Sequence, residues 1–285
     1  MLLWAPQGAP EFIYTVVLKP RFLRNMANAA LFSIIPKQAI LLEGAVMLNP
    51  ADPVVSGALM LGVYEKFETE LMRKILKPGM TVLDVGANVG YYTAIAAYRV
   101  GNHGRVIAFE PDPVNFSFLN ATIKANAFQN VSAHQAALGD RNDETTLFKS
   151  PSNMGDHRMY AFPESTETIT VPLMTLDDFV KSQGLQKIDV IKMDIQGAEG
   201  QALRGMMNAL GAQKSVTLIT EFWPKGLKAA GTDPRWFLET LHDLNFSIMH
   251  IDEASFTVRN ISDFQAFINS LPGRKYTNLI CEKKQ

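Results

Sequence analysis

The sequence "TVLDVGANVGYYT", residues 81–93, joins a short apolar strand to a turn with two glycines and then to an expected helix. A strand, a glycine-rich turn and a helix in this order commonly hold a ligand against the first turn of the helix. The ligand could be a nucleoside triphosphate, a dinucleotide or another adenosine compound, and the rest of the chain must distinguish these possibilities.

Length and composition limit the class of protein. The chain has 285 residues, 47% of them hydrophobic and 19% charged, which suits a folded α/β domain with a sizeable core. Its net charge of −1 gives no electrostatic argument for a nucleic-acid partner. The single cysteine, Cys281, cannot form an internal disulfide and is expected to be a buried core thiol in a reducing compartment.

The apolar segments favour a cytoplasmic protein. Residues 1–18 lack the basic start of a secretory signal. The most apolar region, residues 26–64, is interrupted by prolines and charges before it reaches the roughly 18–20 residues that span a bilayer. We therefore expect no transmembrane segment. Residues 26–35 ("MANAALFSII") are expected to form a helix that covers the main domain, and a helix lying on a membrane or a partner is the alternative. A homo-oligomer is left open.

Strands and helices alternate after residue 78, which predicts a mostly parallel sheet with helices on both faces. The expected strands are residues 82–85, 106–109, 131–137, 190–193, 216–220, 246–251 and 276–282. The expected helices are residues 63–76, 91–99, 113–126, 176–183, 200–210 and 234–244. The domain prediction is a main domain over 62–285, with a partly helical extension over 1–61 that packs on it or covers its site.

Polar residues gather where these strands end, and ligands of such sheets bind beyond the carboxyl ends of the strands. The motifs are "DVGANVG" (84–90), "FEPD" (109–112), "HQAALGD" (134–140), "KMDIQGAE" (192–199) and "TEFWP" (220–224). An acidic residue at one strand end is commonplace. Four of these motifs, all but the one at 134–140, place an acidic residue at the end of a strand, and together they indicate a ligand site.

The glycine turn excludes two of the ligand classes. A triphosphate-binding loop requires a lysine after its last glycine, and none follows Gly90. The G-x-G-x-x-G spacing of a dinucleotide-dependent oxidoreductase is also absent. Asp84, just before the turn, suits an ammonium group, and loop N–H groups could hold a carboxylate. Glu110, 20 residues after Gly90, can accept both hydroxyls of a ribose. Adenosine with an amino-acid tail and no phosphate describes S-adenosylmethionine.

With these motifs together, the sequence resembles the FkbM-type methyltransferases, a branch of the class I enzymes that use S-adenosylmethionine. The resemblance runs through "VLDVGANVGYYT", "FEPDP", "ALGD", "IKMDIQGAE" and "EFWP", and covers residues 62–284. The upstream "GVYEKFE" (62–68) and the closing "NLICEKK" also fit. Gln196 stands where the family usually has glutamate or a similar polar residue, a departure that scarcely affects the assignment. Nothing is carried over to residues 1–61.

The resemblance implies a Rossmann-like sheet of seven strands in the order 3-2-1-4-5-7-6, the last antiparallel, and methyl transfer to a hydroxyl of a small molecule, sugar, glycan or natural product. By resemblance, the turn surrounds the methionine part of the donor, Glu110 binds the ribose and the following residues flank the adenine. The implied cofactor-binding residues are Asp84, Gly86, Ala87, Asn88, Gly90, Tyr92, Glu110, Pro111, Asp112, Gln135 and Ala136.

The catalytic residues are expected at the fourth and fifth strand ends. An alcohol acceptor needs a base as its proton leaves, and Asp194 is the leading candidate, with Lys192 on the same strand face two residues earlier. Glu199 is either catalytic or a charge that stabilises the first turn of its helix. Glu221 could share a divalent ion with Asp194. Two carboxylates are thin evidence for that ion, so S-adenosylmethionine is the predicted cofactor and a divalent metal ion is the less favoured addition.

The acceptor is expected to be covered by the loop of residues 150–166, which is rich in turn formers yet carries apolar side chains. Asn153, His157 and Arg158 on this loop, together with Trp223 after the fifth strand, are the candidate acceptor contacts. A solvated loop and a core tryptophan are the alternatives. A second hypothesis for the whole chain is a regulatory or scaffolding domain that binds S-adenosylmethionine without turnover; the acid at position 194 argues against it.

Overall fold

The computed structural model describes residues 34–284, apart from residues 152, 166 and 274. The predicted helix over 26–35 therefore lies outside the described residues for all but its last two positions, which are not helical.

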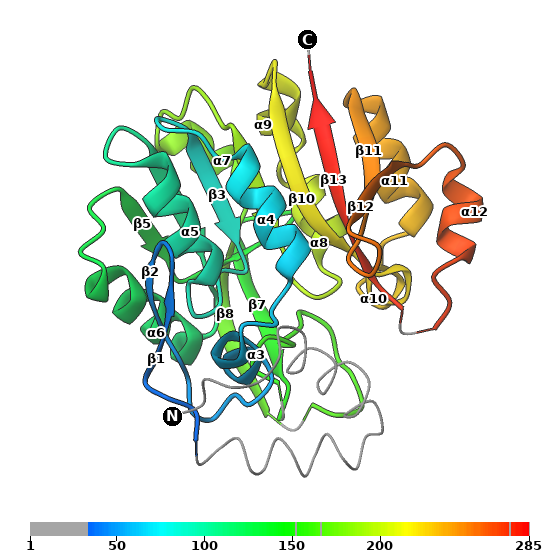
Figure 1. Cartoon of the computed structure of the whole chain (residues 1–285). Helices are drawn as coiled ribbons and strands as arrows, with labels where there is room; N and C mark the ends of the chain where they lie inside the picture. Colours follow the sequence, from blue (N-terminus) through cyan, green and yellow to red (C-terminus); the bar gives the residue numbers. More distant parts are fainter. Residues whose placement is uncertain (1–33, 152, 166, 274, 285) are drawn as a thin grey trace.

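A central sheet of eight strands organises the molecule, in the order β12-β11-β13-β10-β9-β3-β4-β5 (Figure 1). Its strands are β3 (Thr81–Val85), β4 (Arg105–Phe109), β5 (Val131–His134), β9 (Val190–Met193), β10 (Val216–Phe222), β11 (Phe246–Asp252), β12 (Thr257–Asn260) and β13 (Thr277–Lys283). The run from β5 to β10 is parallel. β13 is antiparallel to both β10 and β11, and β12 closes the edge as an antiparallel hairpin partner of β11. The sheet therefore differs from the seven strands expected, because β12 extends it.

A strand expected over 131–137 divides between two sheets. Ala136 N–H donates to His134 O at 3.0 Å, a tight turn that takes the chain out of the central sheet after β5. β6 (Ala137–Leu138) then joins a separate three-stranded sheet of order β6-β8-β7, with β7 (Asp143–Lys149) and β8 (Glu167–Met174). β7 and β8 were not predicted. Their polar residues face water on one side, so the apolar run that marks a buried strand is missing.

Helices cover both faces of the central sheet, as the alternation of apolar side chains requires. Val82 and Val106 face a core shared with α4 (Lys66–Ile75) and α5 (Tyr91–Val100), and α4 crosses the near face in Figure 1. Leu83 and Ile107 face the opposite core. Helices that contribute to that second core are α7 (Leu176–Ser182), α8 (Glu199–Arg204), α9 (Met207–Ala212), α10 (Pro224–Ala229), α11 (Pro234–Asp243) and α12 (Phe264–Asn269). α6 (Pro113–Ala125) packs beside β5.

The helix expected over 200–210 is two helices, α8 and α9, because the chain turns at Gly205. A Cβ at Gly205 would lie 1.9 Å from the carbonyl oxygen of Gly139, so this position must be glycine for the two segments to approach. The remaining predicted helices and strands agree with the structure within a few residues at their ends. Cys281 is buried, as predicted.

The described part of the N-terminal segment packs against the domain that follows it. It forms β1 (Gln38–Leu41), β2 (Gly44–Met47) and α3 (Val55–Leu61). Ala45 N–H donates to Asn126 Oδ1, and Met47 N–H donates to Thr122 Oγ1, so the hairpin is tied to α6. Val46, Leu48, Val55 and Leu59 share the core of α4 and α5. The boundary at 61/62 stays a prediction.

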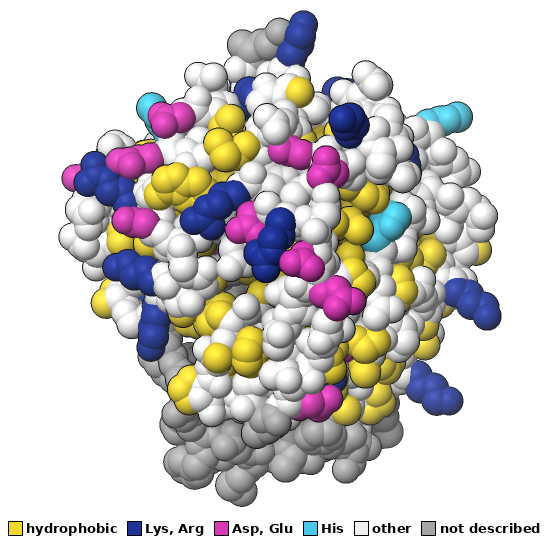
Figure 2. Space-filling view, turned by 180° about the vertical axis from the view of Figure 1, so that it is seen from behind, with side chains coloured by type: hydrophobic (Ala, Val, Ile, Leu, Met, Phe, Trp, Pro, Cys, Tyr) yellow, Lys and Arg dark blue, Asp and Glu magenta, His cyan; other side chains and the backbone are white. Residues whose placement is uncertain are grey.

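Among the described helices, none combines the length and the apolar character needed to cross a bilayer. On the face seen in Figure 2, side chains of both charges are interspersed with apolar ones.

Candidate functional site

The glycine turn after β3 is fixed by its two neighbouring strands. Gly86 has φ +84°, and a Cβ there would lie 2.0 Å from the carbonyl oxygen of Asp194, so both the backbone angle and the close approach require glycine. The N–H groups of Gly86 and Ala87 donate to the carbonyl oxygen of Phe109 at 2.9 and 3.0 Å. The turn thereby brings the ends of β3, β4 and β9 together.

The amides of this turn do not form the open cradle that we expected. Besides Gly86 and Ala87, Asn88 N–H donates to Glu110 Oε2 at 2.8 Å, and Gly90 N–H donates to Ala87 O at 2.8 Å. These four donors are already used within the protein. Gly90 is instead a packing position, because a Cβ there would lie 2.9 Å from Leu119 Cδ1.

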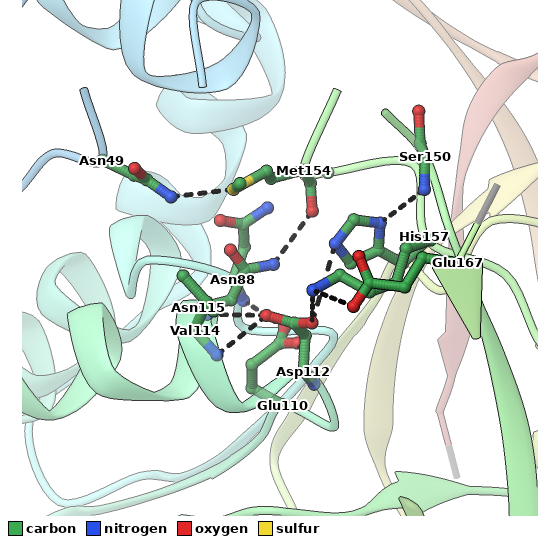
Figure 3. Close-up of polar contacts among 12 residues, drawn as sticks. Asn49, Asn88, Glu110, Asp112, Val114, Asn115, Ser150, Met154, His157 and Glu167 are labelled. Atoms are coloured by element: carbon green, nitrogen blue, oxygen red, sulfur yellow. Dashed lines mark hydrogen bonds and ion pairs between the residues drawn. The ribbon is translucent and has the colours of Figure 1, made fainter. Parts of the chain in front are cut away.

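Glu110, at the end of β4, is held from both sides. Its Oε2 accepts from Asn88 N–H at 2.8 Å, and its Oε1 accepts from Asp112 N–H at 2.9 Å (Figure 3). The residue is 5% exposed. Burial raises the pKa of Glu110 to about 8, although both hydrogen bonds act in the opposite direction. Each carboxyl oxygen keeps a further lone pair with which to accept from a ligand hydroxyl.

A cavity of about 550 Å³ opens beside Glu110. Five of the predicted cofactor-binding residues line it: Gly86, Asn88, Glu110, Pro111 and Ala136. Asp194, Gln196, Asn115, Leu138 and Leu147 also line it, and the sequence analysis missed the last three. The predicted adenine neighbour Gln135 is exposed and does not line this cavity. Its side chain points outward because the turn at Ala136 ends the regular alternation of β5.

Asp112 is a structural residue rather than a wall of the cavity, which corrects its expected place beside the adenine. Its Oδ1 accepts from the N–H groups of Val114 and Asn115 and so caps α6. Its Oδ2 lies 3.4 Å from Lys149 Nζ and 3.8 Å from His157 Nε2 (Figure 3). One carboxylate therefore connects the end of β4 to the end of β7.

The loop between β7 and β8 roofs the cavity with Met154, Gly155, His157 and Met159. Asn115 Nδ2 donates to Met154 O at 2.9 Å, and Asn49 Nδ2 donates to Met154 Sδ at 2.8 Å (Figure 3). His157 Nδ1 accepts from Ser150 N–H. The loop thus contacts the side of the site that holds Glu110, and its role over the acceptor stays a prediction.

Asn153 and His157, two of the loop residues singled out in the sequence, have partners within the loop. Asn153 Oδ1 accepts from Gly155 N–H and shapes the turn. Burial lowers the pKa of His157, which favours its neutral form.

Arg158 connects the loop to the segment after β10. Its guanidinium pairs with Asp156 at 2.7 and 2.8 Å and lies 4.3 Å from the ring of Phe162 and 4.8 Å from that of Trp223. Trp223 Nε1 and Tyr160 Oη are buried without a hydrogen-bond partner in the part of the chain that the structure describes. Of the two, Tyr160 also lies near Arg158, whose guanidinium is 5.7 Å from the centre of its ring.

A second cavity, of about 330 Å³, lies on the other side of the glycine turn. Asp84, Tyr92 and Lys192 line it together with Tyr64, and it shares Gly86, Asn88 and Asp194 with the larger cavity. Asp84 and Lys192 are register partners on β3 and β9. Asp84 accepts from Thr93 Oγ1, and burial raises the pKa of Asp84 to about 6.

Two acidic residues beside this cavity were missed in the sequence. Lys192 Nζ lies 3.0 Å from Glu68 Oε1 and 3.9 Å from Asp194 Oδ2, and Tyr92 Oη donates to Glu65 Oε2 at 2.8 Å. Burial raises the pKa of Glu65 to about 8. Glu68 is fully buried although its helix looks amphipathic, and the "GVYEKFE" motif was the available signal.

Asp194, Glu199 and Glu221 converge at the ends of β9 and β10. Each offers an oxygen, and these oxygens all lie within 4.8 Å of one another. Gln196 Nε2 donates to Asp194 Oδ1 at 2.7 Å, and Glu199 Oε1 accepts from Ile195 N–H at 3.0 Å. The structure brings the four predicted catalytic residues, these three and Lys192, into one region. Gln196, the residue that departs from the family pattern, is a direct hydrogen-bond partner of Asp194.

In two carboxyls of this cluster, those of Glu199 and Glu221, the pKa is shifted upward, toward the neutral form. Burial, followed by the negative charge of Asp194, raises the pKa of Glu199 to about 7. Burial and the charges of Asp194 and Glu199 raise the pKa of Glu221 well above its ordinary value. The three carboxyls can bind hydroxyl groups or hold a cation, and any one of them that is ionised can accept a proton.

Residues 84–248 match the model of the methyltransferase FkbM domain. The hexuronic acid methyltransferase AglP of Haloferax volcanii is 30% identical over 166 residues, which are 58% of this chain and 62% of that protein. The 2-O-methyltransferase NoeI of Sinorhizobium fredii is 25% identical over 173 residues, 55% of this chain and 69% of that protein. Methyltransferase 1 of Beauveria bassiana is 26% identical over 144 residues, 44% of this chain and 57% of that protein. The matches thus span about six-tenths of the first of these relatives.

Among solved structures, the methyltransferase FkbM of Methylobacillus flagellatus is 17% identical, with a TM-score of 0.44 over 91% of this chain and 59% of that one. A methyltransferase of Aquifex aeolicus that depends on S-adenosylmethionine is also 17% identical, with a TM-score of 0.42 over 77% of this chain and 91% of that one.

Proposed function

Because this chain belongs to the FkbM methyltransferase family, we propose that it transfers a methyl group from S-adenosylmethionine to a hydroxyl oxygen of a small molecule, sugar or natural product. The observation that carries the proposal is the position of Glu110, buried between two backbone donors at the wall of a cavity of about 550 Å³.

The two cavities support a position for each part of the donor. Glu110 binds the ribose hydroxyls, and Pro111, Ala136 and Leu138 flank the adenine. The methionine part lies past Gly86 toward Tyr64, Asp84, Tyr92 and Lys192 in the smaller cavity. Asn88 Oδ1 supports this placement, because it is buried without a partner among the described side chains and both cavities reach its residue. Asp84 attracts the ammonium group of the methionine part.

The acceptor lies beyond Asp194, on the side of Glu199 and Glu221. When bound, S-adenosylmethionine supplies a methyl group already activated on a sulfonium sulfur. Asp194 takes up the hydroxyl proton, and Gln196 orients it through the bond to Oδ1. Tyr160 and Trp223 offer unpaired donors to acceptor oxygens, which suits a molecule with several hydroxyls. Arg158 contributes a cation that stacks on the ring of Trp223.

The finer features of the fold belong to the same proposal. If β12 is set aside as an addition, the pairings of the other seven strands support the family order 3-2-1-4-5-7-6, with β13 as the antiparallel last strand. A buried free thiol at Cys281 supports a cytoplasmic location. The net charge of −1 supports an acceptor other than nucleic acid.

Donor binding and turnover test the proposal separately. Calorimetric titration with S-adenosylmethionine and with S-adenosylhomocysteine should give one site per chain, and a nicotinamide dinucleotide should not bind. A mass-shift screen over hydroxylated sugars, polyketides and lipids should then yield an acceptor that gains one methyl group. No donor binding would overturn the proposal. Donor binding with no donor consumption across the screen would favour the regulatory domain instead.

A further inference from the structure

The acid cluster at the ends of β9 and β10 has the geometry of a cation site. Asp194 directly follows β9, Glu221 is the second-last residue of β10, and Glu199 begins α8, so three separate segments supply one carboxylate each. One oxygen from each lies within 4.8 Å of the others. Oxygens bound to a common ion at roughly 2.0–2.6 Å lie at most about twice that distance apart, so the three oxygens are within reach of one ion after small side-chain movements.

The buried oxygens of this cluster lack partners. Glu199 Oε2 and Glu221 Oε2 have no hydrogen-bond partner among the residues that the structure describes, and their residues are 0% and 4% exposed. Buried carboxylate oxygens are normally paired, because desolvation without compensation is costly. An unpaired oxygen on each of two converging side chains indicates that a ligand completes the site.

Protein cations near the cluster are already engaged. Lys192 Nζ is 3.9 Å from Asp194 Oδ2 but is nearer to Glu68, at 3.0 Å. Arg158 pairs with Asp156 through two short contacts. Glu65 and Glu68 add further acidic groups on the side of Lys192, so the lysine has carboxyl partners other than Glu199 and Glu221.

We propose that Asp194, Glu199 and Glu221 together bind one divalent cation of the hard class, Mg²⁺ or Mn²⁺. Carboxylate oxygens are the ligands that these ions prefer. Three protein oxygens occupy half of an octahedral shell, which leaves positions for water and for acceptor hydroxyls. Asp194 lines the larger cavity, so the ion is reached from the side where ligands enter.

The role of the ion rests on the proposed function, whereas its binding does not. A hydroxyl bound to the ion has a lower pKa, so its proton leaves more readily as methyl transfer proceeds. Two neighbouring hydroxyls on one acceptor could both bind the ion, which would select a vicinal diol such as a sugar.

Binding of Mn²⁺ to the protein without donor or acceptor is the test. Electron paramagnetic resonance of free Mn²⁺ should show one bound equivalent per chain. Glu221→Gln and Glu199→Gln, which keep the side-chain shape, should weaken binding at least tenfold. Glu144→Gln is the matched control, since Glu144 is exposed on β7 away from the cluster, and it should bind like the wild type. Circular dichroism verifies that each variant is folded.

Should the buried glutamine variants fail to fold, Asp194→Asn decides the question, because the Asp194 side chain is 23% exposed and tolerates replacement more easily. No bound Mn²⁺ at millimolar concentration, or equal binding by the wild type and the cluster variants, overturns the cation site. Methyl transfer that continues unchanged in chelator, with no Mn²⁺ bound, would remove the ion and leave the proposed function standing. Mn²⁺ binding at the cluster in a protein without donor affinity would do the opposite.

Discussion

Glu110 at the end of β4 and Glu221 at the end of β10 are glutamates of nearly equal burial, 5% and 4% exposed, with different surroundings. Glu110 accepts one backbone hydrogen bond on each oxygen. Glu221 faces two more acidic residues and has an unpaired oxygen within the described chain. The first carboxyl is oriented before any ligand binds, whereas the second is incomplete without one. Burial alone therefore does not distinguish a preformed contact from a site that a ligand must complete.

The largest effect is expected in the acid cluster of Asp194, Glu199 and Glu221. Asp194→Asn keeps the shape of the side chain but removes its capacity to take up a proton, and general base catalysis contributes roughly 10²- to 10⁴-fold. Turnover of an identified acceptor should fall by that order, while donor affinity measured by calorimetry stays within a few-fold. Activity that persists within a few-fold would mean that alignment of the substrates is sufficient and that Asp194 is not the base.

Glu110, which is oriented before a ligand binds, should control the affinity for the donor. Glu110→Ala removes two ribose contacts, each of which contributes about 1 kcal/mol even when the carboxyl is neutral. Calorimetry should therefore show donor binding weakened by at least about tenfold. Gln135→Ala is the matched control, because that side chain is exposed and does not line the cavity. Wild-type affinity in Glu110→Ala would refute the assignment of the ribose position.

Stability should reveal how much the two backbone bonds compensate Glu110 for its burial. Because the folded pKa of Glu110, about 8, is above the ordinary value of 4.5, unfolding releases a proton between these pH values. This stabilising contribution is complete below about pH 4.5 and is lost as the pH rises toward 8.

Glu110→Gln cannot ionise and should lack this loss. Urea unfolding at pH 5 and pH 8 should show the variant gaining at least about 1 kcal/mol relative to the wild type, since one pKa unit corresponds to about 1.4 kcal/mol. An unchanged difference at the two pH values would show that the two amides hold Glu110 ionised in the free protein.

The smallest effect is expected in the loop between β7 and β8. Met154, Gly155 and His157 line the cavity assigned to the donor, so S-adenosylhomocysteine alone should slow tryptic cleavage after Arg158 by several-fold. Cleavage after Lys187, an exposed residue between α7 and β9, serves as the internal control and should not change. Equal protection at the two positions, or none at Arg158, would mean that the loop does not respond to the donor.

The central strands, the need for glycine at position 86 and the buried acid at 110 could be predicted, because each depends on residues close together in the sequence. Lys192 and Glu68 could not be paired in advance, since 123 intervening residues separate them and the helix that carries Glu68 looks ordinary. The loop amides were predicted as ligand donors, yet they bond to Phe109 and Glu110. Sequence patterns mark which segments meet, but not which donors remain free after they meet.

The two oxygens of Asp112 have separable duties. Oδ1 caps α6, and Oδ2 faces Lys149 and His157 beneath the loop. An amide in its place would retain an oxygen for the helix but present a nitrogen to two nitrogen-bearing side chains. Asp112→Asn would thus keep the cap of α6 while weakening the contacts that hold the loop. In this one side chain, the oxygen that caps the helix and the oxygen that holds the loop can be changed independently.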